Sequence, residues 1–75
     1  MSVYKIRCIV EWIRAQGKLP RDPYDQALSV DELMEWFGLN ERLSRGEQVY
    51  MRGELSAIVE AELLLEELKL TEVMR

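Results

Sequence analysis

Residues 44–70 read SRGEQVYMRGELSAIVEAELLLEELKL, and this stretch decides the fold. It opens with Ser44 and places Glu47 three residues later, the pattern of a capping box, in which each side chain accepts a hydrogen bond from the amide of the other residue. From there to the end of the stretch, Gly53 is the one residue that disfavours a helix. We therefore expect a long helix over residues 47–70, about 36 Å in length.

The apolar face of this helix is unusually broad. Apolar residues recur every three or four positions, and Leu63, Leu64 and Leu65 follow one another near the end. Successive helical residues point about 100° apart, so at least one of these leucines should face outward in a lone monomer. We expect a second copy or a partner helix to complete the core. The alternative is that the N-terminal helix folds back and covers the whole face within one chain.

An uncovered apolar patch on a small protein commonly marks a docking surface. The sequence predicts such a surface along the apolar stripe of the last helix, with a rim of acidic residues. Its predicted members are Ile58, Leu64, Leu65 and Leu68, rimmed by Glu60, Glu62 and Glu67. The predicted partner is a protein, a second copy of this chain, or both.

Upstream of this helix the sequence predicts a first helix and a connector. Apolar residues at helical spacing predict a helix over residues 3–16, and Gly17 ends it. The connector, residues 18–28, contains two prolines and two aspartates, which suit turns and exclude a regular helix. We expect Tyr24 and Leu28 to hold the connector to the core.

Two short helices are expected between the connector and the long helix. Ser29 and Glu32 form a second capping box, which predicts a helix over residues 30–37. Asn40 is suited to cap another short helix over residues 41–45. No alternating strand pattern persists anywhere in the chain. The predicted fold is all-α, a single domain over residues 1–75, built as a three- to four-helix bundle with one long C-terminal helix and completed by dimerisation or a partner.

Charge is divided between the two ends of the chain. Residues 1–21 sum to +4 and the whole chain to −4, so residues 22–75 sum to −8. The basic first helix can therefore lie favourably beside the acidic last helix. A chain with this division of charge is typical of a protein that docks rather than one that catalyses.

The composition argues against enzymes and metal proteins. There is no histidine, and Cys8 is the only cysteine, so an intrachain disulfide is impossible and a zinc site is nearly excluded. Without histidine, neither general acid–base chemistry nor an activated thiol has an obvious basis. We interpret Cys8 as a structural residue. The aspartates and glutamates do not have EF-hand spacing. We expect no enzymatic activity, no cofactor, no metal and no small-molecule substrate.

A helix-turn-helix regulator is the first alternative. Residues 30–52 resemble this motif in outline, with Gly38 at the turn. The residues that would contact DNA are Asn40, Arg42, Arg45 and Arg52. The candidate recognition segment is interrupted and acidic, and the chain has a pI of about 4.8 rather than a basic footprint. Binding to nucleic acid is therefore disfavoured.

A further alternative is an acidic inhibitor that imitates nucleic acid. Rows of glutamate at helical spacing can occupy a basic groove in a partner. A solvated helix face explains the same glutamates more simply.

The sequence has no apolar run of membrane-spanning length and no visible secretory signal, so we expect no membrane partner and a cytoplasmic location.

Overall fold

The computed structural model describes the backbone of residues 3–73 and the side chains of residues 3–70. Its helices are α1 (Val3–Ala15), α2 (Val30–Trp36), α3 (Leu39–Arg42) and α4 (Arg45–Val73). Within residues 3–73 there is no β-strand, and the only β-type pairing is an isolated bridge between Arg21 and Ala27. The prediction of an all-α class is confirmed.

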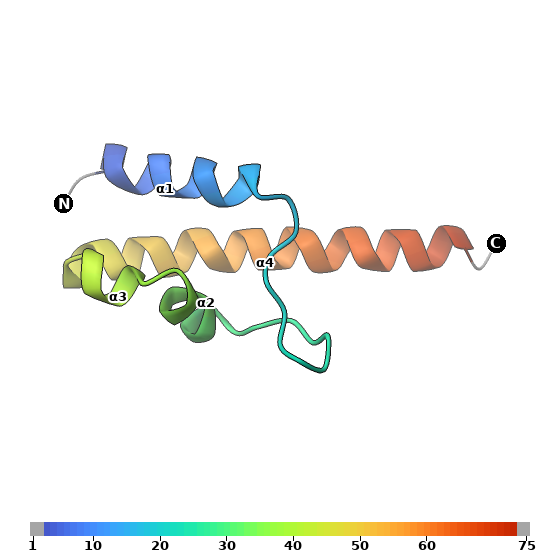
Figure 1. Ribbon diagram of the computed structural model, residues 1–75. Helices are drawn as coiled ribbons and strands as arrows, with labels where there is room; N and C mark the ends of the chain where they lie inside the picture. The colour runs from blue at the N-terminus through green and yellow to red at the C-terminus, as the bar shows by residue number, and fades with distance from the viewer. Residues whose placement is uncertain (1–2, 74–75) are drawn as a thin grey trace.

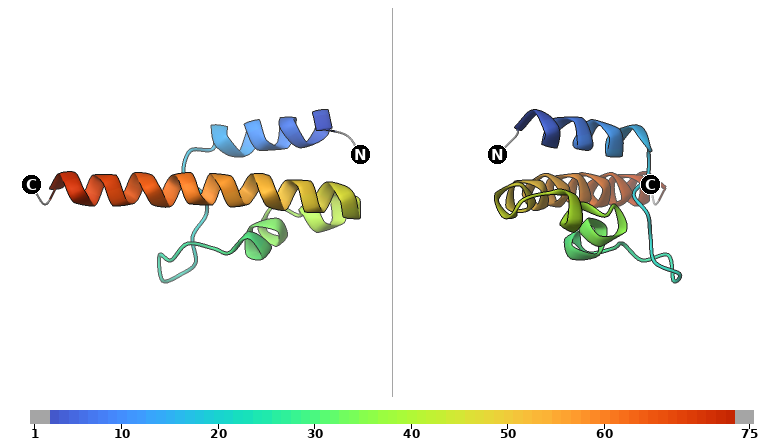
Figure 2. Two further views of the ribbon diagram at one scale, coloured as in Figure 1. Left: turned by 180° about the vertical axis from the view of Figure 1, so that it is seen from behind. Right: turned by 60° about the vertical axis from the view of Figure 1, so that its left-hand side comes forward.

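Helix α4 is the axis of the molecule. Helix α1 lies along one side of its N-terminal half, and α2 and α3 lie on the other side (Figures 1 and 2). The C-terminal half of α4 extends beyond these helices. The radius of gyration is 13.8 Å, whereas a compact domain of this length has a value of about 11 Å. The molecule is therefore elongated, with extents of 47 × 25 × 18 Å.

The core lies entirely around the N-terminal half of α4. Helix α4 contributes Met51 and Leu55, both fully buried, and Ile58 and Val59 pack against the edge of the cluster. The other buried apolar side chains come from α1, the connector, α2, α3 and the turn before α4. They are Ile6, Val10, Ile13, Leu28, Leu33, Met34, Leu39 and Leu43.

Both predicted capping boxes are formed. The amide of Ser44 donates to Glu47 Oε1 at 2.9 Å, and the amide of Glu47 donates to Ser44 Oγ at 3.3 Å. Ser29 and Glu32 exchange the same pair of bonds at 3.0 and 3.2 Å. Helix α4 begins directly after its cap, at Arg45, and runs to Val73, so it is longer at both ends than the predicted 47–70.

Helix α3 differs from its prediction. It starts at Leu39, immediately after Gly38, which has a left-handed φ of +67°. Asn40 therefore lies inside the helix, and the prediction that Asn40 caps it is wrong. The left-handed glycine turns the chain so that Leu39 enters the core, where it is 2% exposed. Burial of this leucine fixes the start of the helix more strongly than the capping preference of asparagine.

The connector is shaped by a turn at Asp22. Asp22 Oδ1 accepts hydrogen bonds from the amides of Tyr24 and Gln26, at 2.9 and 2.8 Å. This turn places Tyr24 at its tip, 85% exposed, so the prediction that Tyr24 holds the connector to the core is wrong. Leu28 is buried, as expected.

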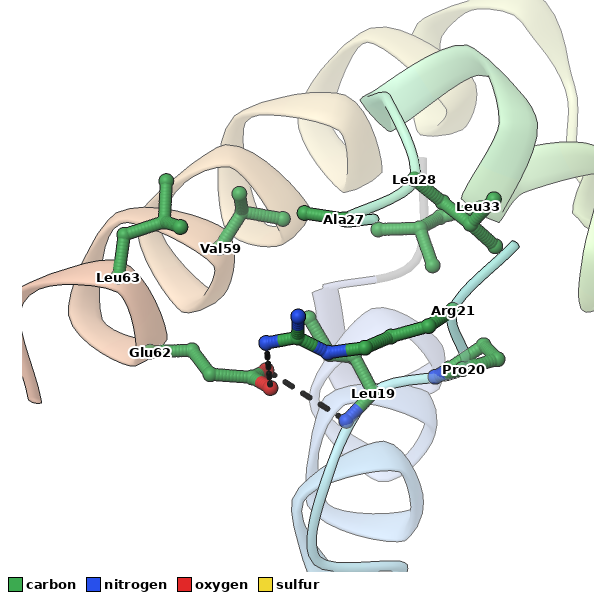
Figure 3. Close-up of a pocket in the computed structure, with 9 residues that line it drawn as sticks. All are labelled: Leu19, Pro20, Arg21, Ala27, Leu28, Leu33, Val59, Glu62 and Leu63. Atoms are coloured by element: carbon green, nitrogen blue, oxygen red, sulfur yellow. Dashed lines mark hydrogen bonds and ion pairs between the residues drawn. The ribbon is translucent and has the colours of Figure 1, made fainter. Parts of the chain in front are cut away.

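Arg21 and Leu19 attach the connector to α4. The amide of Leu19 donates to Glu62 Oε2 at 3.4 Å, and Arg21 Nη2 lies 3.9 Å from Glu62 Oε1 (Figure 3). Arg21 also forms an ion pair with Glu66. A small apolar hollow lined in part by Leu28 lies beneath this attachment. The connector thereby crosses α4 at the end of the core.

Candidate partner-binding surface

The part of α4 beyond the core exposes five leucines. We call residues 60–73 the distal segment. Its leucine side chains are between 43% and 64% exposed. They are Leu63, Leu64, Leu65, Leu68 and Leu70. Single large apolar side chains at this degree of exposure are common, but five within eight residues are an unusual concentration of exposed apolar surface.

The leucines of the distal segment point in several directions. Leu63 and Leu70 are one heptad apart and share a side of the helix, whereas Leu64 and Leu68 are about one turn apart on a different side. Leu65 faces a shallow groove at the end of α1, which Gly17 also lines. No single neighbouring helix within the chain can cover all of these directions.

The alternative of complete coverage by the first helix does not hold for the distal segment. Helix α1 has 13 residues and buries Met51 and Leu55 through Ile6, Val10 and Ile13. At Gly17 the chain turns away with φ of +87° and crosses α4 as the connector. The described helices therefore cover the N-terminal half of α4, whereas the distal segment meets only the connector and the end of α1, beside Leu63 and Leu65.

In the structure, the residues predicted to form the docking surface fall into two groups. Leu64, Leu65 and Leu68 are exposed on the distal segment, and Glu60 and Glu67 are exposed beside them. The other two residues have roles within the fold. Ile58 packs at the edge of the core, and Glu62 is half-buried against the connector.

The solvent-exposed area of the whole chain is larger than that of a compact monomer of the same mass. A compact monomer of 8.8 kDa exposes about 4,800 Å² by the usual relation between area and mass. This chain exposes 5906 Å². The surplus of about 1,100 Å² is similar to the area that one partner buries in a standard protein–protein interface, about 800 Å².

The residues of the helix-turn-helix alternative do not form a recognition helix. Helix α3, which would be that helix, has four residues. Arg52 forms an ion pair with Asp31 of α2, so its guanidinium is engaged within the fold. Asn40, Arg42 and Arg45 are exposed. The backbone carbonyl of Asn40 accepts a hydrogen bond from the side chain of Gln48 at 3.1 Å.

A second surface feature was not predicted from the sequence. A groove lies between α1 and the α2–α3 pair, and we call it the aromatic groove. Its apolar lining comprises Cys8, Ile9, Trp12, Ile13, Leu19, Pro20, Trp36, Phe37 and Leu39, with Gln16, Lys18 and Arg42 completing it. Cys8, interpreted above as structural, has an exposed side chain here.

The rings of the aromatic groove are held in a defined arrangement. Trp12 and Phe37 meet edge to face, with centroids 5.7 Å apart and planes inclined by 82°. Trp12 remains 55% exposed and Trp36 64% exposed. A sequence signal existed, since Cys8 and Trp12 are four residues apart and lie off the stripe of Ile6, Val10 and Ile13.

Searches against protein-family models, curated proteins and solved structures find no match to this chain. Among the described residues, no helix is both long enough and apolar enough to cross a bilayer. Within the same part of the chain, no three or more cysteine, aspartate or glutamate side chains cluster as metal ligands do.

Proposed function

We propose that this chain is a small, non-enzymatic protein–protein interaction module that binds through the distal segment of α4. It would act as a subunit, an adaptor or an inhibitor of a larger assembly. The observation that carries this proposal is the exposure of Leu64, Leu65 and Leu68 on a helix that extends beyond its own core. A helix that presents apolar side chains in this way suits insertion into a groove of a partner.

The driving force is the removal of leucine surface from water. Burial of apolar area contributes about 25 cal/mol per Å², so two or three buried leucines contribute several kcal/mol to binding. Glu60 and Glu67 flank the leucines and favour a partner whose groove has a positively charged rim. The same charges disfavour association with other acidic surfaces.

The test compares matched variants in affinity capture from the native lysate. The tagged wild-type protein, the double variant Leu64→Glu/Leu68→Glu and the control Val49→Glu are used side by side. Val49 is 71% exposed on the N-terminal half of α4, so its substitution adds a glutamate to the same helix outside the distal segment. Circular dichroism checks that all three proteins keep equal helicity.

We expect a protein partner that survives nuclease treatment to be retained by the wild type and the Val49→Glu control and lost from the double variant. Equal recovery with the double variant contradicts the assignment of the surface. Recovery of nucleic acid, with all co-purifying proteins lost after nuclease treatment, favours the helix-turn-helix regulator instead.

A further inference from the structure

The aromatic groove takes its lining from three parts of the chain. Its lining residues come from α1, from the α2–α3 pair and, at Leu19 and Pro20, from the connector. The groove follows α1 from Cys8 to Gln16, which is about 12 Å at 1.5 Å per residue. That length accommodates about two helical turns, and Leu64 and Leu68 of the distal segment are one turn apart.

The lining of the groove has the composition of a binding hot spot. Trp12 and Trp36 are more than half exposed, although tryptophan is among the most costly side chains to leave in water. Phe37 and Leu39 lie deeper, half-buried and buried respectively. Partly exposed tryptophans around a buried apolar floor are typical of surfaces at which a few residues supply most of the binding energy.

Charge distinguishes the groove from the distal segment. Lys18 and Arg42 are exposed at its rim, and no aspartate or glutamate of the described residues lines it. The distal segment has the opposite character, with Glu60 and Glu67 exposed beside its leucines. Two distal segments packed directly against each other would bring like charges together, which is unfavourable. A distal segment in the aromatic groove brings opposite charges together.

We propose that the distal segment of one copy occupies the aromatic groove of a second copy, and that the exchange is reciprocal. A two-fold axis then creates two identical contacts, each between one distal segment and one groove. This inference rests on the proposed function and names the partner as a second copy of this chain. It accounts for both exposed apolar surfaces and for the surplus area with one interface.

Complementation between two variants tests the arrangement. The distal variant carries Leu64→Glu/Leu68→Glu, the groove variant carries Trp36→Glu/Arg42→Glu, and Val49→Glu is the control. Mass is measured by sedimentation equilibrium over a range of concentrations. We expect the wild type and the control to reach twice the monomer mass, and each of the other variants alone to stay monomeric. An equimolar mixture of the two variants should form a heterodimer, because one intact groove meets one intact distal segment.

The tryptophans supply a readout that does not depend on a groove variant folding. Trp12 and Trp36 are the only tryptophans of the chain, and both line the groove. We expect the fluorescence of the wild type to shift to longer wavelength on dilution as the groove empties. The distal variant, in which neither tryptophan is altered, should show the longer wavelength at every concentration.

The outcomes separate this inference from the proposed function. A groove variant that still dimerises overturns the assignment of the groove, as does wild-type fluorescence that stays constant while the mass halves. A wild type that is monomeric at its highest soluble concentration overturns the second copy as partner. In each of these cases the proposed interaction module is supported if Leu64→Glu/Leu68→Glu still abolishes capture of a lysate partner. It is contradicted if the double variant still captures that partner.

Discussion

The carboxylate of Glu62 lies 3.9 Å from the guanidinium of Arg21, 41 positions earlier in the sequence, and accepts the amide of Leu19 at 3.4 Å. These contacts attach the connector to α4 at the point where the core ends (Figure 3). They divide α4 into a half packed by other helices and a distal segment that is not.

Removal of the Arg21 charge should loosen this attachment. The side chains of Arg21 and Glu62 are about one-quarter exposed, at 25% and 23%, so the pair is partly shielded from solvent. We expect Arg21→Gln to lower the free energy of unfolding by about 1 kcal/mol, and high salt to reduce the difference. Urea denaturation at two salt concentrations measures both effects. Arg7→Gln, on the exposed face of α1, is the matched control; an equal loss in that variant contradicts the role of Arg21.

The two capping boxes should each contribute to stability, and the second more than the first. Ser44→Ala removes the acceptor of the Glu47 amide, and Glu47 is buried, whereas Glu32 at the first box is exposed. We expect a loss of about 1 kcal/mol for Ser29→Ala and a larger loss for Ser44→Ala. Urea denaturation measures both. Ser56→Ala, in the middle of α4, should be neutral or slightly stabilising, because alanine is the better helix former. An equal loss at Ser56 contradicts a capping origin.

Alanine substitutions at two glycines should change the stability of the protein in opposite directions. Gly53 lies within α4, and a Cβ at that position meets no atom within 4 Å. Gly53→Ala should therefore stabilise the protein by about 1 kcal/mol and raise Tm by ~4–8 °C. Gly38 has equal space but a φ of +67°, so Gly38→Ala should destabilise it by about 1–2 kcal/mol. Thermal unfolding compares the two; a shared sign contradicts the backbone argument.

Local signals predicted much of this fold. The two serine–glutamate pairs and the 3.6-residue periodicity place α1, α2 and α4 close to their observed bounds, because capping and amphipathicity depend on neighbouring residues. The start of α3 was missed, since burial of Leu39 is a tertiary effect. Tyr24 was misplaced for a local reason, because a turn set by Asp22 directs it to solvent.

The surfaces were predictable only in part. The run of leucines at residues 63–65 indicated an exposed apolar patch, and all three are exposed. Glu62 was expected at the rim, but its contact with Leu19 joins residues 43 positions apart, which periodicity cannot reveal. The aromatic groove depends on the position of α1 relative to α2. Cys8 and Trp12 indicate one side of the groove in the sequence, but Trp12 and Trp36 come together only through that packing.

Truncation of leucines in the two halves of α4 should have very different effects on the monomer. Leu55 is fully buried, so Leu55→Ala should cost about 2–5 kcal/mol and unfold much of so small a domain. Leu68 lies on the exposed distal segment, and Leu68→Ala should change stability by less than about 0.5 kcal/mol. Denaturation at low protein concentration, where association is negligible, makes the comparison. A large loss for Leu68→Ala under those conditions contradicts its exposure.

Amide hydrogen exchange should differ between the core-packed half of α4 and the distal segment. Protection of the distal segment should also depend on association. The amides near Met51 and Leu55 lie under the core and should exchange only on global unfolding. The amides of the distal segment belong to a part of α4 that no other described helix packs along in the monomer, so they should open locally and exchange much faster. If a partner or second copy binds the leucines, protection of the distal segment should rise with the concentration of that partner, while protection near Leu55 changes less. Mass spectrometry of exchanged peptides at several concentrations reads both regions together. Uniform protection along α4 in the dilute monomer contradicts the division of α4 into a packed half and a distal segment. The variant Leu64→Glu/Leu68→Glu should remove the concentration dependence and leave the protection near Leu55 unchanged.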